Sequence, residues 1–118
     1  MSIEDLKQMK PTLRWRERML DGDDLFSEEI IYETNKVLDV FINRLIPLNG
    51  KSDRKQIEQI VKELVFQLND LGGIEGKYNN YIETLEREEL CEFIDMAITV
   101  TGYELAEGED ITEDWREW

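Results

Sequence analysis

Histidine is absent from the 118 residues of this chain, and Cys91 is the only cysteine. Without an imidazole base for a serine or cysteine nucleophile, the sequence excludes Ser-His and Cys-His hydrolases. It also leaves no plausible ligand set for structural zinc, and an intramolecular disulfide cannot form. We expect Cys91, at the margin of an apolar helical face, to be a half-buried structural thiol. The sequence therefore predicts a protein that is not an enzyme, with no metal site, no catalytic residue and no cofactor.

Long apolar runs are also missing. No stretch approaches the roughly 18 apolar residues of a membrane span, and the start, MSIEDLKQMK, lacks the apolar core of a signal peptide. A lone cysteine fits a reducing compartment. Because 41% of the residues are hydrophobic, the 36% charged residues do not imply disorder. We expect one helical domain, residues 1–118, that is cytoplasmic and binds no membrane.

Neither glycine-containing segment carries a ligand motif. GGIEG (72–76) lacks the Lys-Ser/Thr pair of a phosphate-binding loop and a preceding strand, so it predicts a helix end and a hinge. DGDDLFSEEIIYE (21–33) has aspartates at relative positions 1, 3 and 4 but no glycine at 6 and no glutamate at 12. The order of a calcium loop is therefore broken, and the segment is predicted to be a loop before a helix.

Cationic residues are scarce: 14 Lys and Arg oppose 28 Asp and Glu, which gives a net charge of −14. Residues 83–118 hold only Arg87 and Arg116 against 13 acidic residues. Such a field repels DNA, RNA and anionic membranes, so we expect no nucleic-acid partner and favour a basic protein partner. The alternative is that the acidic surface only keeps the protein in solution.

The basic start of the chain has the opposite sign. Residues 1–20 contain five basic and three acidic residues, including the segment RWRER (14–18). We expect these cations to pair with the acidic C-terminal third of the same chain, although each surface pair contributes little. The alternative is contact with phosphate, with Trp15 stacking on a base.

Helical periodicity dominates the rest of the sequence. Apolar residues recur at steps of three and four over 27–46, after Ser27 as a good N-cap and before Pro47. The clearest apolar face covers 53–71, where Asp53 and Gln56 have capping-box spacing and glycines follow. These two helices are predicted to form an antiparallel hairpin.

A third helix is predicted over about 81–101. Its start is ambiguous, since Asn80 with Glu83 makes one capping box and Thr84 suits a later start. A short helix over about 11–20 is indicated by Pro11 at its first position. The fold class is therefore all-α: a compact bundle of three main helices with shorter terminal helices. Its predicted core holds Ile31, Val37, Leu38, Phe41, Leu45, Ile57, Ile60, Val61, Leu64, Val65, Leu68, Phe93, Ala97 and Trp115.

The last ten residues, EDITEDWREW, combine two tryptophans with five acids. Ile111, Trp115 and Trp118 fall at i, i+4 and i+7, which places them on one face of a short helix over about 110–117. Burial of a large aromatic side chain is worth roughly 2–3 kcal/mol, enough to fix a short segment. We expect the tryptophans to anchor the segment on the chain's own bundle. The alternative is a segment that binds a partner or forms a dimer.

Carboxylates are the functional groups that remain available once histidine and cysteine chemistry is excluded. In ETLEREELCEFID (83–95), helical spacing puts Glu88, Glu92 and Asp95 on one side, with Glu86 and Glu89 beside them. The sequence predicts an inhibitor-like, immunity-like protein that binds a basic partner without catalysis. The alternatives are a carboxylate-only metal-binding protein or enzyme, and a structural subunit of a helical assembly. The predicted partner-binding residues are Glu86, Glu88, Glu89, Glu92, Asp95, Glu113 and Asp114.

YIETLEREELCEFI (81–94) and the closing WREW resemble a family of short, acidic, uncharacterised bacterial proteins. That family carries an IET-x-x-RE segment and ends near an Arg-acid-Trp. The resemblance covers mainly residues 81–118, and it implies a bacterial origin and an all-helical fold without lending a catalytic residue. The matching residues are Ile82, Glu83, Thr84, Arg87, Glu88, Arg116, Glu117 and Trp118.

Overall fold

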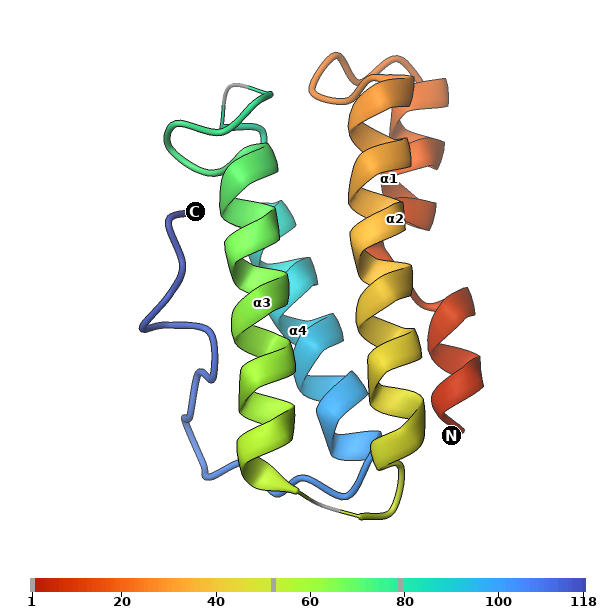
Figure 1. Ribbon diagram of the computed structural model, residues 1–118. Helices are drawn as coiled ribbons and strands as arrows, with labels where there is room; N and C mark the ends of the chain where they lie inside the picture. The colour runs from red at the N-terminus through yellow and green to blue at the C-terminus, as the bar shows by residue number, and fades with distance from the viewer. Residues whose placement is uncertain (1, 52, 79) are drawn as a thin grey trace.

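A computed structural model describes residues 2–51, 53–78 and 80–118 (Figure 1). Every regular element among them is a helix, which confirms the all-α bundle. The predicted helix 11–20 is present as α1, and a 3-10 helix that the sequence did not indicate precedes it. In chain order the elements are η1 (Ile3–Gln8), α1 (Pro11–Leu20), α2 (Glu28–Leu45), η2 (Ile46–Leu48), α3 (Arg54–Gly72) and α4 (Thr84–Val100).

Local polar signals set most helix starts. The Ser27 hydroxyl accepts a hydrogen bond from the Ile30 N–H at 3.2 Å, and the Asp53 carboxylate accepts one from the Gln56 N–H at 3.1 Å. Both predicted N-caps are therefore confirmed. For the third helix, neither Asn80 nor Thr84 is the N-cap. The N-cap of α4 is Glu83, whose N–H donates to the Glu86 carboxylate at 3.1 Å.

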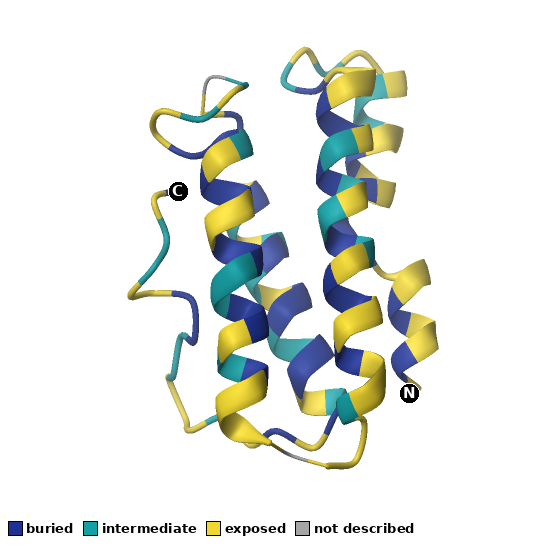
Figure 2. Cartoon of the chain, in the orientation of Figure 1, coloured by how far each residue is buried: buried dark blue, intermediate teal, exposed yellow. Residues whose placement is uncertain are grey.

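The four α-helices lie alongside one another and enclose a single core (Figures 1 and 2). Helices α2 and α3 form the predicted antiparallel hairpin, while α1 packs against α2 and α4. In Figure 2 the residues coloured as buried lie on the inward side of each helix, as amphipathic periodicity requires. The predicted core residues are buried except Val37 and Trp115, which are half-buried.

Trp15 is fully buried, although the sequence analysis left it out of the core. Its ring stacks on Phe26 with centroids 5.2 Å apart and meets the edge of Tyr81 at 6.1 Å. Gly72 allows this cluster to form, because a Cβ there would lie 2.6 Å from the Tyr81 ring. The Tyr81 hydroxyl bonds to that of Thr34, and burial raises the pKa of Tyr81 to about 12.

The predicted terminal helix over 110–117 is wrong. Residues 111–115 form turns, and the segment runs along the outside of the bundle (Figure 1). The backbone makes local turn hydrogen bonds, such as Trp115 N–H to the Thr112 carbonyl at 3.1 Å, and it also bonds to α3. The Asn69 side chain donates to the Trp115 carbonyl at 2.8 Å and accepts from the Glu117 N–H at 2.9 Å. Anchoring on the chain's own bundle is nevertheless confirmed, since Ile111 and Trp118 are buried. Trp115 stays half-buried because helical spacing does not apply to turns.

Candidate functional site

The acids of α4 face two different neighbours. Glu86 faces α1 and is only 1% exposed. One carboxylate oxygen accepts a hydrogen bond from the Arg18 guanidinium at 2.8 Å, and the other accepts the Glu83 N–H. A carboxylate buried among such partners stabilises the start of the helix and cannot reach a partner protein. We therefore remove Glu86 from the predicted partner-binding set.

Glu89 faces α1 as well. It accepts a hydrogen bond from the indole N–H of Trp15 at 3.1 Å, and it lies 3.5 Å from the Arg14 guanidinium and 3.7 Å from that of Arg18. Its side chain is only 11% exposed. Glu89 thus satisfies a buried donor and offsets nearby cations, and it too leaves the predicted set.

The predicted pairing of the basic start with the acidic C-terminal third is confirmed for Arg14 and Arg18. Two other cations of this region contact α2 instead. Lys10 binds Asp39 at 2.7 Å, and Arg16 binds Glu28 at 3.2 Å. The sequence could not indicate this division, because α1 lies between α2 and α4 and meets acids on both.

A second side of α4 faces the C-terminal segment. The Cys91 thiol contacts the Thr112 hydroxyl at 3.7 Å, which places the segment against the side that also carries Glu88 and Asp95. Glu92 lies between the two sides and lines a hollow beside α1 together with Glu89. Glu88 and Glu92 are exposed, and Asp95 is half-buried. Cys91 is half-buried, as predicted. Its burial raises the pKa of the thiol, which disfavours the reactive thiolate.

The C-terminal segment adds further acids to this side. Glu113 and Asp114 are exposed, as the partner-binding prediction requires. Within residues 2–51, 53–78 and 80–118, neither they nor the three outward acids of α4 form an ion pair. We call Glu88, Glu92, Asp95, Glu113 and Asp114 the acidic surface.

Asp95 shows the effect of uncompensated charge. Partial burial, together with the negative charges of Asp110 and Glu109, raises its pKa to about 6. Asp110 behaves in the opposite way. Although burial alone would raise its pKa, hydrogen bonds from Thr112 and a 2.8 Å ion pair with Arg116 lower it. Arg116 thus compensates the charge of Asp110, whereas Asp95 forms no ion pair with a cation among the described residues.

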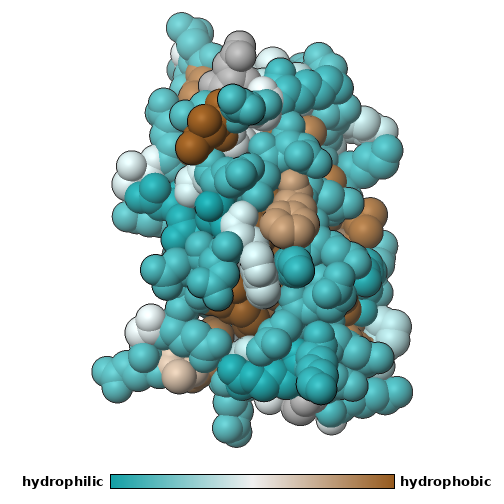
Figure 3. All heavy atoms as spheres, turned by 60° about the vertical axis from the view of Figure 1, so that its left-hand side comes forward, coloured by the Kyte–Doolittle hydropathy of each residue, from teal (hydrophilic) through white to brown (hydrophobic). Residues whose placement is uncertain are grey.

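Sequence reasoning missed residues that build this surface. Asp110 and Glu109 entered the sequence analysis only as part of the acidic C-terminal third, yet they act directly on Asp95. Asn69 positions the segment, and its signal was available: an amide directly after Leu68, at the edge of the apolar stripe of α3. Figure 3 shows that the side formed by α3 and the C-terminal segment is mainly hydrophilic, with small separate apolar areas.

Other kinds of site find little support. Among the described residues, no group of three or more acidic or cysteine side chains is placed to hold a metal ion. No described helix has the length and apolar character needed to cross a bilayer. The chain matches no protein-family model, no curated protein and no solved structure. The resemblance to acidic bacterial proteins therefore stays a prediction.

Proposed function

We propose that this chain is a non-enzymatic binding protein whose acidic surface recognises a basic protein partner. The single observation that carries the proposal is the division of acids on α4. Glu86 and Glu89 face α1 and are paired within the molecule, whereas the more outward Glu88, Glu92 and Asp95 form no ion pair with any described residue. A partner that supplies lysine or arginine relieves the mutual repulsion among these outward acids.

Electrostatics also sets the expected behaviour of the complex. An uncompensated negative surface increases the rate at which a positive partner associates, and dissolved salt screens that attraction. Binding that depends on the acidic surface therefore weakens as ionic strength rises. Because the acids are arranged on a helix and a segment pinned to the bundle, the surface is preformed and loses little entropy on binding.

A matched pair of variants tests the proposal. The first replaces Glu88, Glu92, Glu113 and Asp114 by the corresponding amides. The control makes the same kind of change at four exposed acids elsewhere and so alters the net charge equally. Those four acids form no ion pair with any described residue, and they are Glu4, Asp21, Asp24 and Glu75. Both variants and the wild type are immobilised and used to retain proteins from a bacterial extract over a salt gradient.

We expect the wild type and the control to retain a basic protein that elutes at moderate salt, and the first variant to lose it. Equal retention by both variants means that only overall charge matters. Retention that is indifferent to salt contradicts an electrostatic interface. The identity of the retained protein is then confirmed by titration with the purified component.

A further inference from the structure

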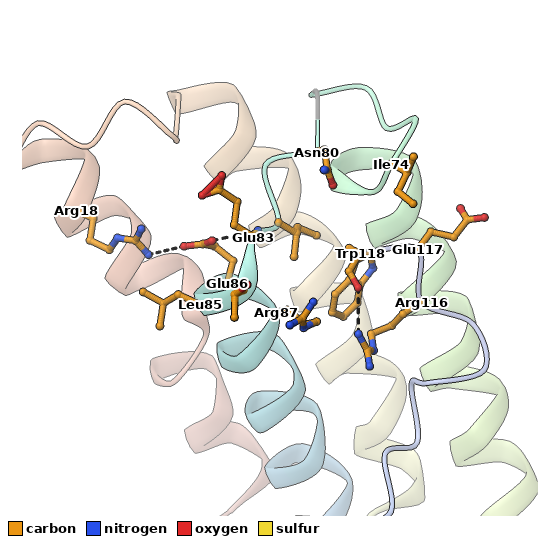
Figure 4. Close-up of a pocket in the computed structure, with 12 residues that line it drawn as sticks. Arg18, Ile74, Asn80, Glu83, Leu85, Glu86, Arg87, Arg116, Glu117 and Trp118 are labelled. Carbon is orange, nitrogen blue, oxygen red and sulfur yellow. Dashed lines mark hydrogen bonds and ion pairs between the residues drawn. The ribbon is translucent and has the colours of Figure 1, made fainter.

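An open hollow of about 790 Å³ lies at the start of α4, where the loop after α3 and the end of the chain meet it (Figure 4). Its lining combines apolar and polar side chains. Ile82 and Trp118 are buried, while Ile74 and Leu85 are 73% and 51% exposed. Exposed aliphatic side chains that gather at a hollow offer apolar contact to a small molecule.

Arg87 supplies an uncompensated cation to this hollow. Each of the other arginines in the described residues forms an ion pair, but half-buried Arg87 forms none. In the view of Figure 4, Arg87 and Arg116 flank Trp118, and the Arg116 guanidinium lies 5.5 Å from the Trp118 ring. Arg87 is therefore available to an anion in a chain that otherwise pairs its arginines.

Trp118 supplies an independent observation. The residue is 9% exposed, and its buried indole N–H has no acceptor among the described residues. The buried indole N–H of Trp15, by contrast, donates to Glu89. Buried donors nearly always have an acceptor, so an orphaned N–H in the wall of a hollow indicates an acceptor that a ligand brings.

Charge limits what the ligand can be. Arg18 is compensated by Glu86 and Arg116 by Asp110, each at 2.8 Å, which leaves Arg87 as the uncompensated cation of the described lining. The first turn of α4 adds the partial positive charge of a helix N-terminus. Glu83 and Glu117 are exposed in the lining and disfavour a second negative charge.

We propose that this hollow binds a small organic monocarboxylate with an apolar body. The carboxylate accepts hydrogen bonds from the Arg87 guanidinium, whose fork matches its two oxygens, and from the Trp118 indole N–H. The apolar body packs against Ile74 and Leu85. A dianionic phosphate fits less well, because its second charge faces Glu83 and Glu117. This site does not depend on the acidic surface or on a protein partner.

Phenylacetate is a suitable probe. Acetate is the control that lacks the apolar body, and benzyl alcohol is the control that lacks the charge. Each is titrated into the full chain at constant ionic strength, and the indole N–H resonances of the three tryptophans are followed by NMR. The variant Trp118→Phe assigns its resonance. We expect a saturable shift of the Trp118 signal with phenylacetate, weaker binding of acetate and benzyl alcohol, and little change at Trp15.

The decisive comparison uses two arginine variants with the same charge change. Arg87→Gln is expected to weaken phenylacetate binding at least about tenfold, since a charge-assisted hydrogen bond is lost. Arg14→Gln, at an exposed position of α1, leaves binding unchanged. Absence of a saturable shift overturns the proposal. It is also overturned if both variants bind equally, or if benzyl alcohol binds as tightly as phenylacetate.

Discussion

On the side of α4 that faces α1, Glu86 and Glu89 contact arginines and hydrogen-bond donors. The outward acids Glu88, Glu92 and Asp95 form no ion pair with any described residue, and Glu88 and Asp95 lie on the side of the C-terminal segment. The same residue type on one helix thus has two roles. Buried and compensated carboxylates hold elements together, because loss of a partner would leave an unpaired charge.

The difference follows from where the chain supplies its cations. Residues 1–20 carry a net positive charge, and α1 brings Arg14 and Arg18 to one side of α4 only. The C-terminal segment brings Arg116, which is already engaged by Asp110. The acidic surface is therefore a consequence of topology as much as of composition. Substitutions on the two sides test this contrast, in order of decreasing effect.

The largest effect is expected for Trp15→Ala, on the compensated side. Trp15 is fully buried, stacks on Phe26 and donates to Glu89, so its removal leaves a cavity and takes one hydrogen-bond donor from Glu89. We expect a loss of about 3–5 kcal/mol in the free energy of unfolding. The half-buried counterpart, Trp115→Ala, is expected to lose about 1–2 kcal/mol. Urea denaturation monitored by circular dichroism measures both, and equal losses would contradict the contrast.

Asn69→Ala comes next and acts on the other side. The substitution removes one donor and one acceptor, leaving the Trp115 carbonyl and the Glu117 N–H without their partner. We expect a loss of about 1–3 kcal/mol. Hydrogen exchange is expected to accelerate most at Glu117 and its neighbours, with little change in α2. Uniform acceleration across the bundle would mean that the segment is not held locally by Asn69.

Glu86→Gln and Glu92→Gln compare a compensated with an uncompensated acid of the same helix. The amide introduced by Glu86→Gln keeps an oxygen for the Glu83 N–H but loses the charge that faces Arg18, so we expect a loss of about 1–2 kcal/mol. Glu92 is exposed and unpaired among the described residues, and its replacement is expected to change stability by less than about 0.5 kcal/mol. Thermal and urea unfolding measure the difference. A reversal of this order would refute the assigned roles.

Asp95→Asn is expected to have a small effect on the free energy of unfolding, and this effect depends on pH. The pKa of Asp95 is about 6 in the folded chain against an ordinary value of 3.8, so the folded state binds the proton more tightly. The resulting stabilisation is fully present below about pH 4 and is lost as the pH rises through about 6. Asp95→Asn should therefore exceed the wild type in stability at neutral pH, by less than about 1 kcal/mol after solvent screening.

Chemical denaturation from acid to neutral pH checks this sign. The two proteins should converge as the wild-type carboxyl is protonated. Asp110, Glu109 and Arg116 face the same region, and the lowered pKa of Asp110 acts in the opposite direction at lower pH. Glu92→Gln serves as the control for the loss of one charge. If the difference in stability between Asp95→Asn and the wild type does not change with pH, the proposed repulsion at Asp95 is contradicted.

Helix periodicity was sufficient to predict the helical bundle, because long amphipathic helices have few ways to pack their apolar faces against one another. The caps at Ser27 and Asp53 were visible as polar residues at fixed spacing before an apolar run. The same reasoning gave a wrong prediction for the C-terminal segment. Its spacing of Ile111, Trp115 and Trp118 fits a helix, but hydrogen bonds to Asn69 on a distant helix compete with local ones.

The acidic surface was only partly predictable. Spacing on a helix placed Glu88, Glu92 and Asp95 on one side, since these positions follow from 3.6 residues per turn. In the folded chain Glu92 lines a hollow beside α1 together with Glu89. Spacing could not show that Glu86 and Glu89 point to α1, because that depends on how helices pack. The hollow beside Trp118 was not visible at all. Its lining comes from residues far apart in the sequence, which only the folded chain brings together.

Asn69 has a consequence for how this sequence can vary. It recognises the carbonyl of Trp115 and the N–H of Glu117, which are main-chain groups that nearly every amino acid provides. Attachment of the segment therefore places little demand on the side chains that point outward from it. Mutations at Glu113, Asp114 or Glu117 can accumulate while the backbone keeps its path. A chain built in this way can change the outer face of its C-terminal segment without refolding.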